Sequence, residues 1–179
     1  MYSDGDGHSP IGFFTQLLVS VYSYFGMLIT SIWDEEVRKD MKRIKWNPFN
    51  SSEELASKSE KVTWYKGVPV YRVDGNSSSF CAIFLTKYEF QGSSGHIWTQ
   101  EETLRHEWGH SVQQLLYGPI MYLLRIGIPS AFIDNDDNTP WEITADLIGG
   151  VNRPYNEDHV NKGWQYFKII MSYKIYFLW

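Results

Sequence analysis

The N-terminal third of the chain contains an uncharged segment, residues 11–33, in which apolar side chains recur with a helical period. The recurring apolar positions are Phe14, Leu17, Leu18, Val21, Phe25, Leu28, Ile29 and Ile32. Polar side chains lie on the other side of the same helix, at Gln16, Ser20, Ser23 and Thr30. The pattern predicts an amphipathic helix that lies on a protein core or on a membrane surface. The segment is long enough to span a bilayer, but its polar residues make the mean hydropathy marginal.

Short apolar runs in the middle of the chain predict β-strands. Two of them, over 62–65 and 68–73, are separated by a two-residue turn. Pro69 lies in the second run, and because proline has no N–H to donate, it predicts an edge position for that strand. A third run, Ser79–Thr86, is continuously apolar, as is typical of a strand that is buried on both faces.

A capping signal predicts that a helix begins after Thr99. Glu102 follows three residues later, so that each of these two side chains can bond the backbone N–H of the other residue. Gly118-Pro119 ends the helical pattern, which places the helix at about 100–117. The helix contains the sequence His-Glu-Trp-Gly-His at 106–110.

The spacing within this motif is that of a zinc site. His106 and His110 are four residues apart and share one helical face, where both imidazoles can reach one metal ion. Glu107 lies beside that face and can act as the general base toward a water molecule at the metal. Gly109 costs about 1 kcal/mol inside a helix, which indicates that another backbone approaches closely there. Two solvated histidines on an amphipathic helix are the simpler alternative.

A catalytic zinc site usually has three protein ligands, and a second predicted helix, over about 140–149, supplies the third. Thr139 and Glu142 are spaced as a capping box, and Pro140 suits the first helical position. Glu142 and Asp146 are four apart and face one way. Glu142 is the expected ligand, and Asp146 is expected to accept a hydrogen bond from a ligand histidine. The alternatives are a simple cap residue and an ordinary surface carboxylate.

Composition and charge narrow the class of protein. The 179 residues are 43% hydrophobic and 21% charged, as in a globular protein. A formal net charge of −5 gives no electrostatic reason to expect nucleic acid as a partner. The single cysteine, Cys81, cannot form an internal disulfide, and a buried, inert thiol is expected. The N-terminus lacks the basic region of a secretory signal peptide, so the localisation stays open.

Several stretches between about residues 60 and 150 carry a resemblance to a known family. They are Tyr65–Val70, Ser79–Leu85, Arg105–His110 with Tyr117–Ile120, and Ile126–Ser130 with Glu142–Asp146. The chain resembles the gluzincin zinc metallopeptidases, and more narrowly the short zincin-like domains at the C-termini of bacterial RHS-repeat and related polymorphic toxin proteins. The resemblance implies one catalytic zinc ion with the ligands His106, His110 and Glu142. It also implies that Glu107 is the base and Asp146 the hydrogen-bond partner of a ligand.

The same resemblance implies a peptide or protein substrate, whose backbone would add to an edge strand at Ser79–Thr86 or its neighbour. A group that stabilises the oxyanion is also expected, and Tyr117, Tyr155 and His159 are available without the spacing choosing among them.

We therefore expect an α+β, zincin-like fold with a small mixed sheet, an active-site helix and a second ligand helix. A mobile terminus and amphipathic or membrane-associated helix would occupy 1–33, and a single metallopeptidase domain 34–179. The expected function is zinc-dependent peptide-bond hydrolysis, with a toxin or effector role as one form of it. A non-catalytic zinc-binding module is the first alternative. A membrane-associated protein of unknown activity, anchored by 11–33, is the second.

Overall fold

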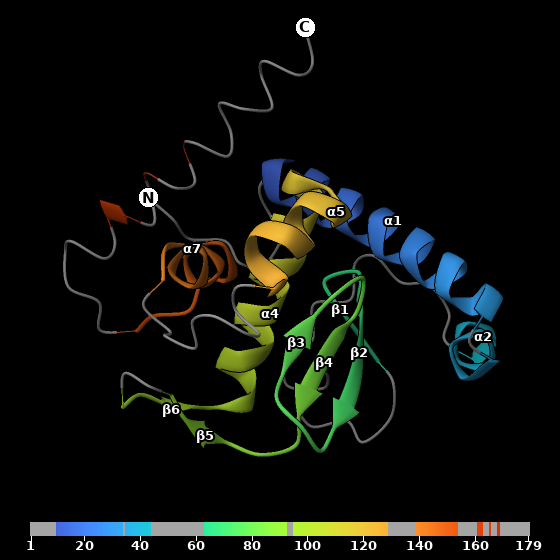
Figure 1. The fold of residues 1–179 in the computed structure, drawn as a ribbon, viewed down its shortest axis with the longest axis horizontal. Helices are drawn as coiled ribbons and strands as arrows, with labels where there is room; N and C mark the ends of the chain where they lie inside the picture. Colours follow the sequence, from blue (N-terminus) through green and yellow to red (C-terminus); the bar gives the residue numbers. More distant parts are fainter. Residues whose placement is uncertain are drawn as a thin grey trace, which may run out of the picture. The chain divides into compact units, whose positions relative to one another are not determined.

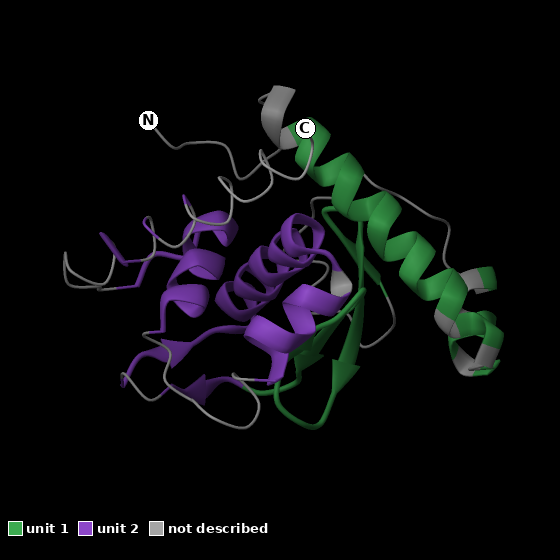
Figure 2. Cartoon of the chain, turned by 45° about the horizontal axis from the view of Figure 1, so that its top comes forward, with its two compact units in different colours: residues 1–88 green, residues 89–179 purple. Residues whose placement is uncertain are grey.

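The structure is a computed structural model that describes residues 10–33, 35–43, 63–92, 95–128 and 139–153, with residues 161, 162, 165 and 168 in addition. These residues form a mixed α+β fold with a small sheet and several helices (Figure 1). The chain divides into two compact units, residues 1–88 and 89–179 (Figure 2), and each is described by itself.

The first unit contains a four-stranded sheet in the order β1-β2-β4-β3. Its strands are β1 (Thr63–Tyr65), β2 (Val68–Val73), β3 (Ser78–Ser79) and β4 (Ile83–Thr86). Antiparallel pairs join β1 to β2 and β3 to β4, whereas β2 and β4 are parallel. Lys66 and Gly67 connect β1 to β2 with φ of 44° and 82°, because a two-residue hairpin turn matches the strand twist when both residues have positive φ. The two strands predicted over 62–65 and 68–73 are confirmed.

The prediction that Pro69 marks an edge strand is wrong, because β2 has β1 on one side and β4 on the other. The physical reason is local. Pairing with β4 begins at Val70, opposite Ile83, one residue after Pro69. Pro69 is paired only with Trp64 of β1, so its missing N–H removes no bond from the parallel ladder.

The prediction of one continuous strand over Ser79–Thr86 is also wrong. β3 ends at Ser79, and a turn closed by a 2.9 Å hydrogen bond from the Phe80 N–H to the Ala82 carbonyl leads into β4. Cys81 takes a φ of 59° in this turn and is half-buried. An apolar run does not distinguish a strand from an apolar turn, and this turn packs against a helix. A Cβ added at Gly26 would lie only 2.4 Å from the Cys81 sulfur.

That helix is α1 (Pro10–Trp33), followed by α2 (Glu35–Arg43), and α1 packs against β2. The predicted helix is confirmed, but the prediction that its apolar stripe lies on the core is wrong. The exposed side chains include Phe14, Leu18, Val21, Phe25, Leu28, Ile29 and Ile32. The buried ones are Gln16, Val19, Ser20, Ser23 and Met27. Small residues face the unit because they let the helix backbone approach closely, as Gly26 does at Cys81.

The membrane-surface alternative for this stripe stays a prediction. Within the described ranges, no helix combines the length and the apolar character needed to cross a lipid bilayer.

The second unit contains a two-stranded sheet and the helices that carry the candidate site. Its elements are β5 (Phe90–Gln91), β6 (Ile97–Trp98), α4 (Gln100–Tyr117), α5 (Pro119–Tyr122), the π-helix η1 (Leu123–Gly127) and α7 (Pro140–Gly149). The helices predicted at about 100–117 and 140–149 are confirmed. So is the first capping box, in which the Glu102 N–H donates to the Thr99 hydroxyl at 3.2 Å and the Thr99 N–H to the Glu102 carboxylate at 3.1 Å.

The capping box predicted at Thr139 is wrong, although α7 does begin with Pro140 in its first turn. Thr139 makes no side-chain cap hydrogen bond. The reason is that the Glu142 carboxylate is turned toward two histidines of α4 instead. The helix ends where predicted, with Gly150 in the left-handed conformation at a φ of 76°.

Candidate metal centre

Two glycines allow α4 and α7 to pack in backbone contact. A Cβ added at Gly109 would lie 2.0 Å from the Ala145 carbonyl oxygen, and one added at Gly149 would lie 2.1 Å from the Arg105 carbonyl oxygen. Either would overlap backbone atoms that no rotamer change can move. The close approach predicted at Gly109 is therefore confirmed, and it brings the carboxylates of α7 within reach of the histidines of α4.

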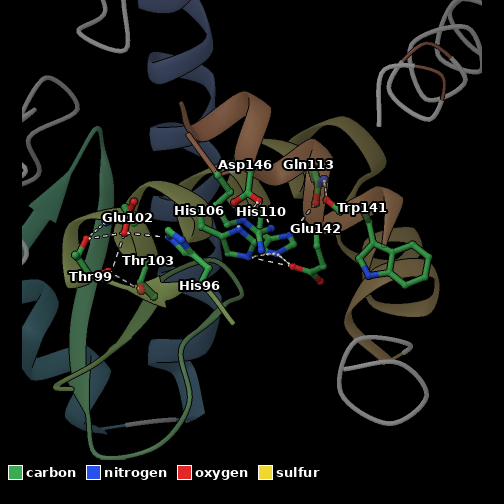
Figure 3. A network of polar contacts seen from close by, with 11 residues as sticks. His96, Thr99, Glu102, Thr103, His106, His110, Gln113, Trp141, Glu142 and Asp146 are labelled. Carbon is green, nitrogen blue, oxygen red and sulfur yellow. Dashed lines mark hydrogen bonds and ion pairs between the residues drawn. The ribbon is translucent and has the colours of Figure 1, made fainter. Parts of the chain in front are cut away.

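His106, His110 and Glu142 meet at one point in this crossing (Figure 3). The Nε2 atoms of the two histidines are 3.0 Å apart. Each Nε2 atom is also 3.0 Å from the Glu142 Oε2 atom. Both histidines are buried and Glu142 is nearly so. Among the described residues, this is the group of histidine and carboxylate side chains that could hold a metal ion.

The outer ring nitrogens of both histidines are bonded to other side chains. His106 Nδ1 lies 2.6 Å from Asp146 Oδ1, as the sequence predicted for Asp146. His110 Nδ1 lies 2.8 Å from Gln113 Oε1, and the Gln113 amide nitrogen donates to the Trp141 carbonyl at 2.8 Å. Because that nitrogen must donate, the Gln113 oxygen is an acceptor and His110 Nδ1 carries a hydrogen. The network thus assigns the Nδ1–H tautomer to both histidines.

This assignment has a direct electrostatic consequence. In their neutral forms, both Nε2 atoms direct lone pairs toward the point where the Glu142 carboxylate also lies. Three acceptors then face one another at 3.0 Å without a donor among them. Such a cluster is stable only with positive charge at its centre, supplied by protons or by a metal ion.

The shifts in pKa also indicate that positive charge is favoured at this cluster. Burial lowers the pKa of His106, but the Asp146 and Glu142 carboxylates outweigh it and raise that pKa well above its ordinary value. Burial also lowers the pKa of His110, and Glu142 raises it to a net increase. Burial raises the pKa of Glu142, but the two histidines hold it well below its ordinary value. The Asp146 and Glu142 carboxylates therefore favour protonated histidines when no metal is bound.

Glu107 lies beside this centre with an unsatisfied acceptor. It is buried, and its Oε2 atom has no hydrogen-bond partner among the described residues. Burial raises the pKa of its carboxyl, while the charges of His110 and His106 act in the opposite direction. A buried carboxylate oxygen without a donor requires one from outside the protein, such as a water molecule or a substrate amine.

Some residues at this site were not assigned a role from the sequence. Gln113 continues the histidine face three residues after His110, which indicates that it lines the same cleft but does not identify it as the hydrogen-bond partner of His110. The sequence pattern did not indicate a role for Arg153 or Trp98. Arg153 donates to Asp146, and the centroid of the Trp98 ring lies 5.1 Å from that of the His106 ring. Tyr122 lies 6.2 Å from His110 between ring centroids.

The roles expected for Tyr117, Tyr155, His159 and the strand region Ser79–Thr86 stay predictions. Tyr155 and His159 lie outside the described residues, and Tyr117 is the last residue of α4. The strand region Ser79–Thr86 belongs to the first unit, whereas all the residues of the centre belong to the second.

The geometry and chemistry of these side chains are the basis on which a function can be inferred. Comparisons with protein-family models, with curated proteins and with solved structures found no match.

Proposed function

We propose that this chain is a zinc-dependent peptidase of the zincin type. The observation that carries the proposal is the cluster of three inward-facing acceptors from His106, His110 and Glu142, 3.0 Å apart. Tetrahedral zinc with bonds of about 2.0–2.1 Å separates its ligand atoms by about 3.3 Å. A small outward shift of these side chains would therefore accommodate the ion, and two imidazoles with one carboxylate are a common ligand set of catalytic zinc.

Open coordination favours a catalytic centre over a structural one. Structural zinc sites are closed by four protein ligands, whereas catalytic sites have three. In the described part of the chain, the group contains three candidate ligands. The Asp146 carboxylate lies on the outer side of His106 and is bonded to its Nδ1 atom. The non-catalytic zinc-binding module is the alternative that a fourth ligand would support.

The reaction would proceed through the chain's own proton-transfer group. Zinc, when bound, supplies Lewis acidity that polarises the scissile carbonyl and makes water more acidic. Glu107 accepts a proton from the water molecule as its oxygen bonds to the carbonyl carbon. It then passes that proton to the amide nitrogen as the carbon–nitrogen bond breaks, releasing an acid and an amine. The raised pKa of Glu107 suits it to both steps.

The test separates metal binding from catalysis. Elemental analysis of the purified chain should give about one zinc per molecule, and the double variant H106A/H110A should give none. Glu107→Gln should retain the zinc because it removes no ligand, but should lower kcat/KM on a mixture of quenched fluorescent peptides by at least about 100-fold.

A folded chain without zinc under non-chelating conditions would overturn the metal centre. Zinc with equal cleavage by the parent and E107Q would overturn the role of Glu107. Zinc without any cleavage, over peptides and unfolded proteins, would favour the non-catalytic module.

A further inference from the structure

We infer that Arg153 is a positioning residue that fixes Asp146 and, through it, the ligand His106. The inference rests on the proposed metal centre. Arg153 is buried and lies just beyond the helix that supplies the carboxylates. It is not one of the candidate ligands and is only 6% exposed, so its effect on the ion is transmitted through its neighbours.

The contacts form one continuous buried chain. The Arg153 Nε atom donates to Asp146 Oδ2 at 2.8 Å, and a terminal guanidinium nitrogen donates to the same oxygen. The other oxygen of Asp146 accepts from His106 Nδ1 at 2.6 Å. Asp146 is 0% exposed, so these donors take the place of water. One carboxylate oxygen is held by arginine, and the other is thereby aimed at the histidine.

Arg153 also supports His106 by a second route. Its guanidinium carbon lies 4.5 Å from the centroid of the Trp98 ring. The same Trp98 ring stands edge-on to His106, at 5.1 Å and 72° between ring planes. His106 is therefore in contact with a carboxylate and an aromatic ring, and Arg153 touches both. A lysine could supply the charge but neither the planar fork nor the stacking surface.

The backbone explains how Arg153 reaches Asp146, seven residues earlier. Gly150 takes the left-handed conformation, and the Val151 N–H donates to the Asp146 carbonyl at 2.9 Å. The chain turns back over the end of the helix, and Arg105 donates to the Gly150 carbonyl at 3.4 Å. The turn thus places the Arg153 guanidinium on the side of Asp146 that faces away from His106.

The experiment measures zinc affinity of the full chain by competition with a chelator at fixed pH. We expect Arg153→Met to weaken zinc binding by about 10–100-fold, the usual effect of losing a partner behind a metal ligand. Arg153→Lys should lose about tenfold, because charge without the fork is insufficient. In an Asp146→Asn background, Arg153→Met should cause a smaller further loss than in the parent, because only the contact through Trp98 then links Arg153 to His106.

The matched control is Arg105→Met, which removes an arginine bonded to the same turn but not to Asp146. It should bind zinc within about twofold of the parent. The absorption spectrum of the cobalt-substituted chain supplies a readout of ligand geometry, and it should change for Arg153→Lys and not for Arg105→Met.

The outcomes separate this inference from the proposed function. A parent that binds no zinc overturns the metal centre and this inference with it. A parent that binds zinc, with R153M and R153K equal to it, overturns the positioning role alone. If R153M does not fold, R153K and the cobalt spectrum decide by themselves. Equal losses in R153K and R105M would show a general effect on the turn and would also contradict the inference.

Discussion

The two candidate ligand histidines have chemically different hydrogen-bond partners. His106 is bonded to the carboxylate of Asp146, whereas His110 is bonded to the neutral amide of Gln113. A carboxylate makes an imidazole more basic and a stronger electron donor to a metal, while an amide mainly fixes its orientation. The pKa directions agree, since the pKa of His106 is raised well above its ordinary value.

These raised pKa values predict that zinc and protons compete. In the metal-free protein, histidines with raised pKa values hold protons up to a higher pH than ordinary imidazoles, and zinc must displace those protons. Zinc affinity should therefore fall as the pH decreases below those pKa values and should level off above them. Glu142, whose pKa is lowered, contributes no proton in this range.

Calorimetric titration with zinc in buffers of different ionisation enthalpy measures the protons released. Below the raised pKa values of the two histidines, affinity should change by about tenfold per pH unit for each proton displaced. Affinity that is constant over this range, with no proton release, would contradict the assigned ionisation states.

At the residue scale, the sequence predicted what local spacing determines. The four-residue separations place His106 with His110, and Glu142 with Asp146, because helical geometry follows from spacing alone. Arg153 could not be predicted, since its approach to Asp146 depends on a turn and on burial. Trp98 belongs to a different element from His106, so only the tertiary structure shows their contact.

At the scale of elements, the backbone contact of α4 with α7 sets the centre. Helix propensity alone would favour alanine at Gly109 by about 1 kcal/mol. Against that gain, an added Cβ would lie 2.0 Å from the Ala145 carbonyl oxygen, and such overpacking costs about 1–3 kcal/mol or more. The cost exceeds the gain, which explains why a glycine occupies the middle of this helix.

Gly109→Ala should therefore lower the free energy of unfolding and, by separating the two helices, weaken zinc binding by at least about tenfold. Chemical denaturation and chelator competition measure the two effects. Gly75→Ala is the control, because Gly75 has no atom within 4 Å of its added Cβ and lies outside the second unit. A G109A variant with unchanged zinc affinity would show that the helix spacing does not determine the centre.

The orientation of α1 shows what a periodic pattern leaves open. Periodicity identifies which residues share a helical face, but it does not state which face is buried. In α1 the face of Ser20, Ser23 and Gly26 lies inward, where small size permits close packing, while Phe25 is 59% exposed. Similarly, the hydrophobic run around Cys81 did not reveal a turn, because the turn is apolar.

At the scale of the whole molecule, the candidate ligands all belong to residues 89–179. The mixed α+β class could be predicted because strand and helix patterns are separate along the chain. The pairing order of the strands could not, since parallel pairing of β2 with β4 is a non-local choice.

Because the native fold assembles the three candidate ligands, zinc should stabilise it if the proposed centre binds the ion. An ion that binds the folded chain alone, at about 100 times its dissociation constant, contributes about 2.7 kcal/mol. For a chain of this size, that corresponds to a rise in Tm of about 5–10 °C. Thermal unfolding with added zinc, against the same sample with a chelator, measures it. H106A/H110A should show no difference between the two conditions, and an equal shift in that variant would indicate nonspecific binding.

The contact between Gly109 and Gly149 and the opposing helix backbones also bears on which ion can enter. The two helices touch through backbone atoms, so they cannot move closer together. A change of side-chain rotamer does not alter their spacing either. Calcium requires about six to eight oxygen ligands at about 2.3–2.6 Å. Two imidazole nitrogens and one carboxylate oxygen held 3.0 Å apart suit a smaller coordination sphere. For the proposed metal centre, the fixed helix spacing would therefore favour an ion of the size of zinc over calcium, although neither glycine is a candidate ligand.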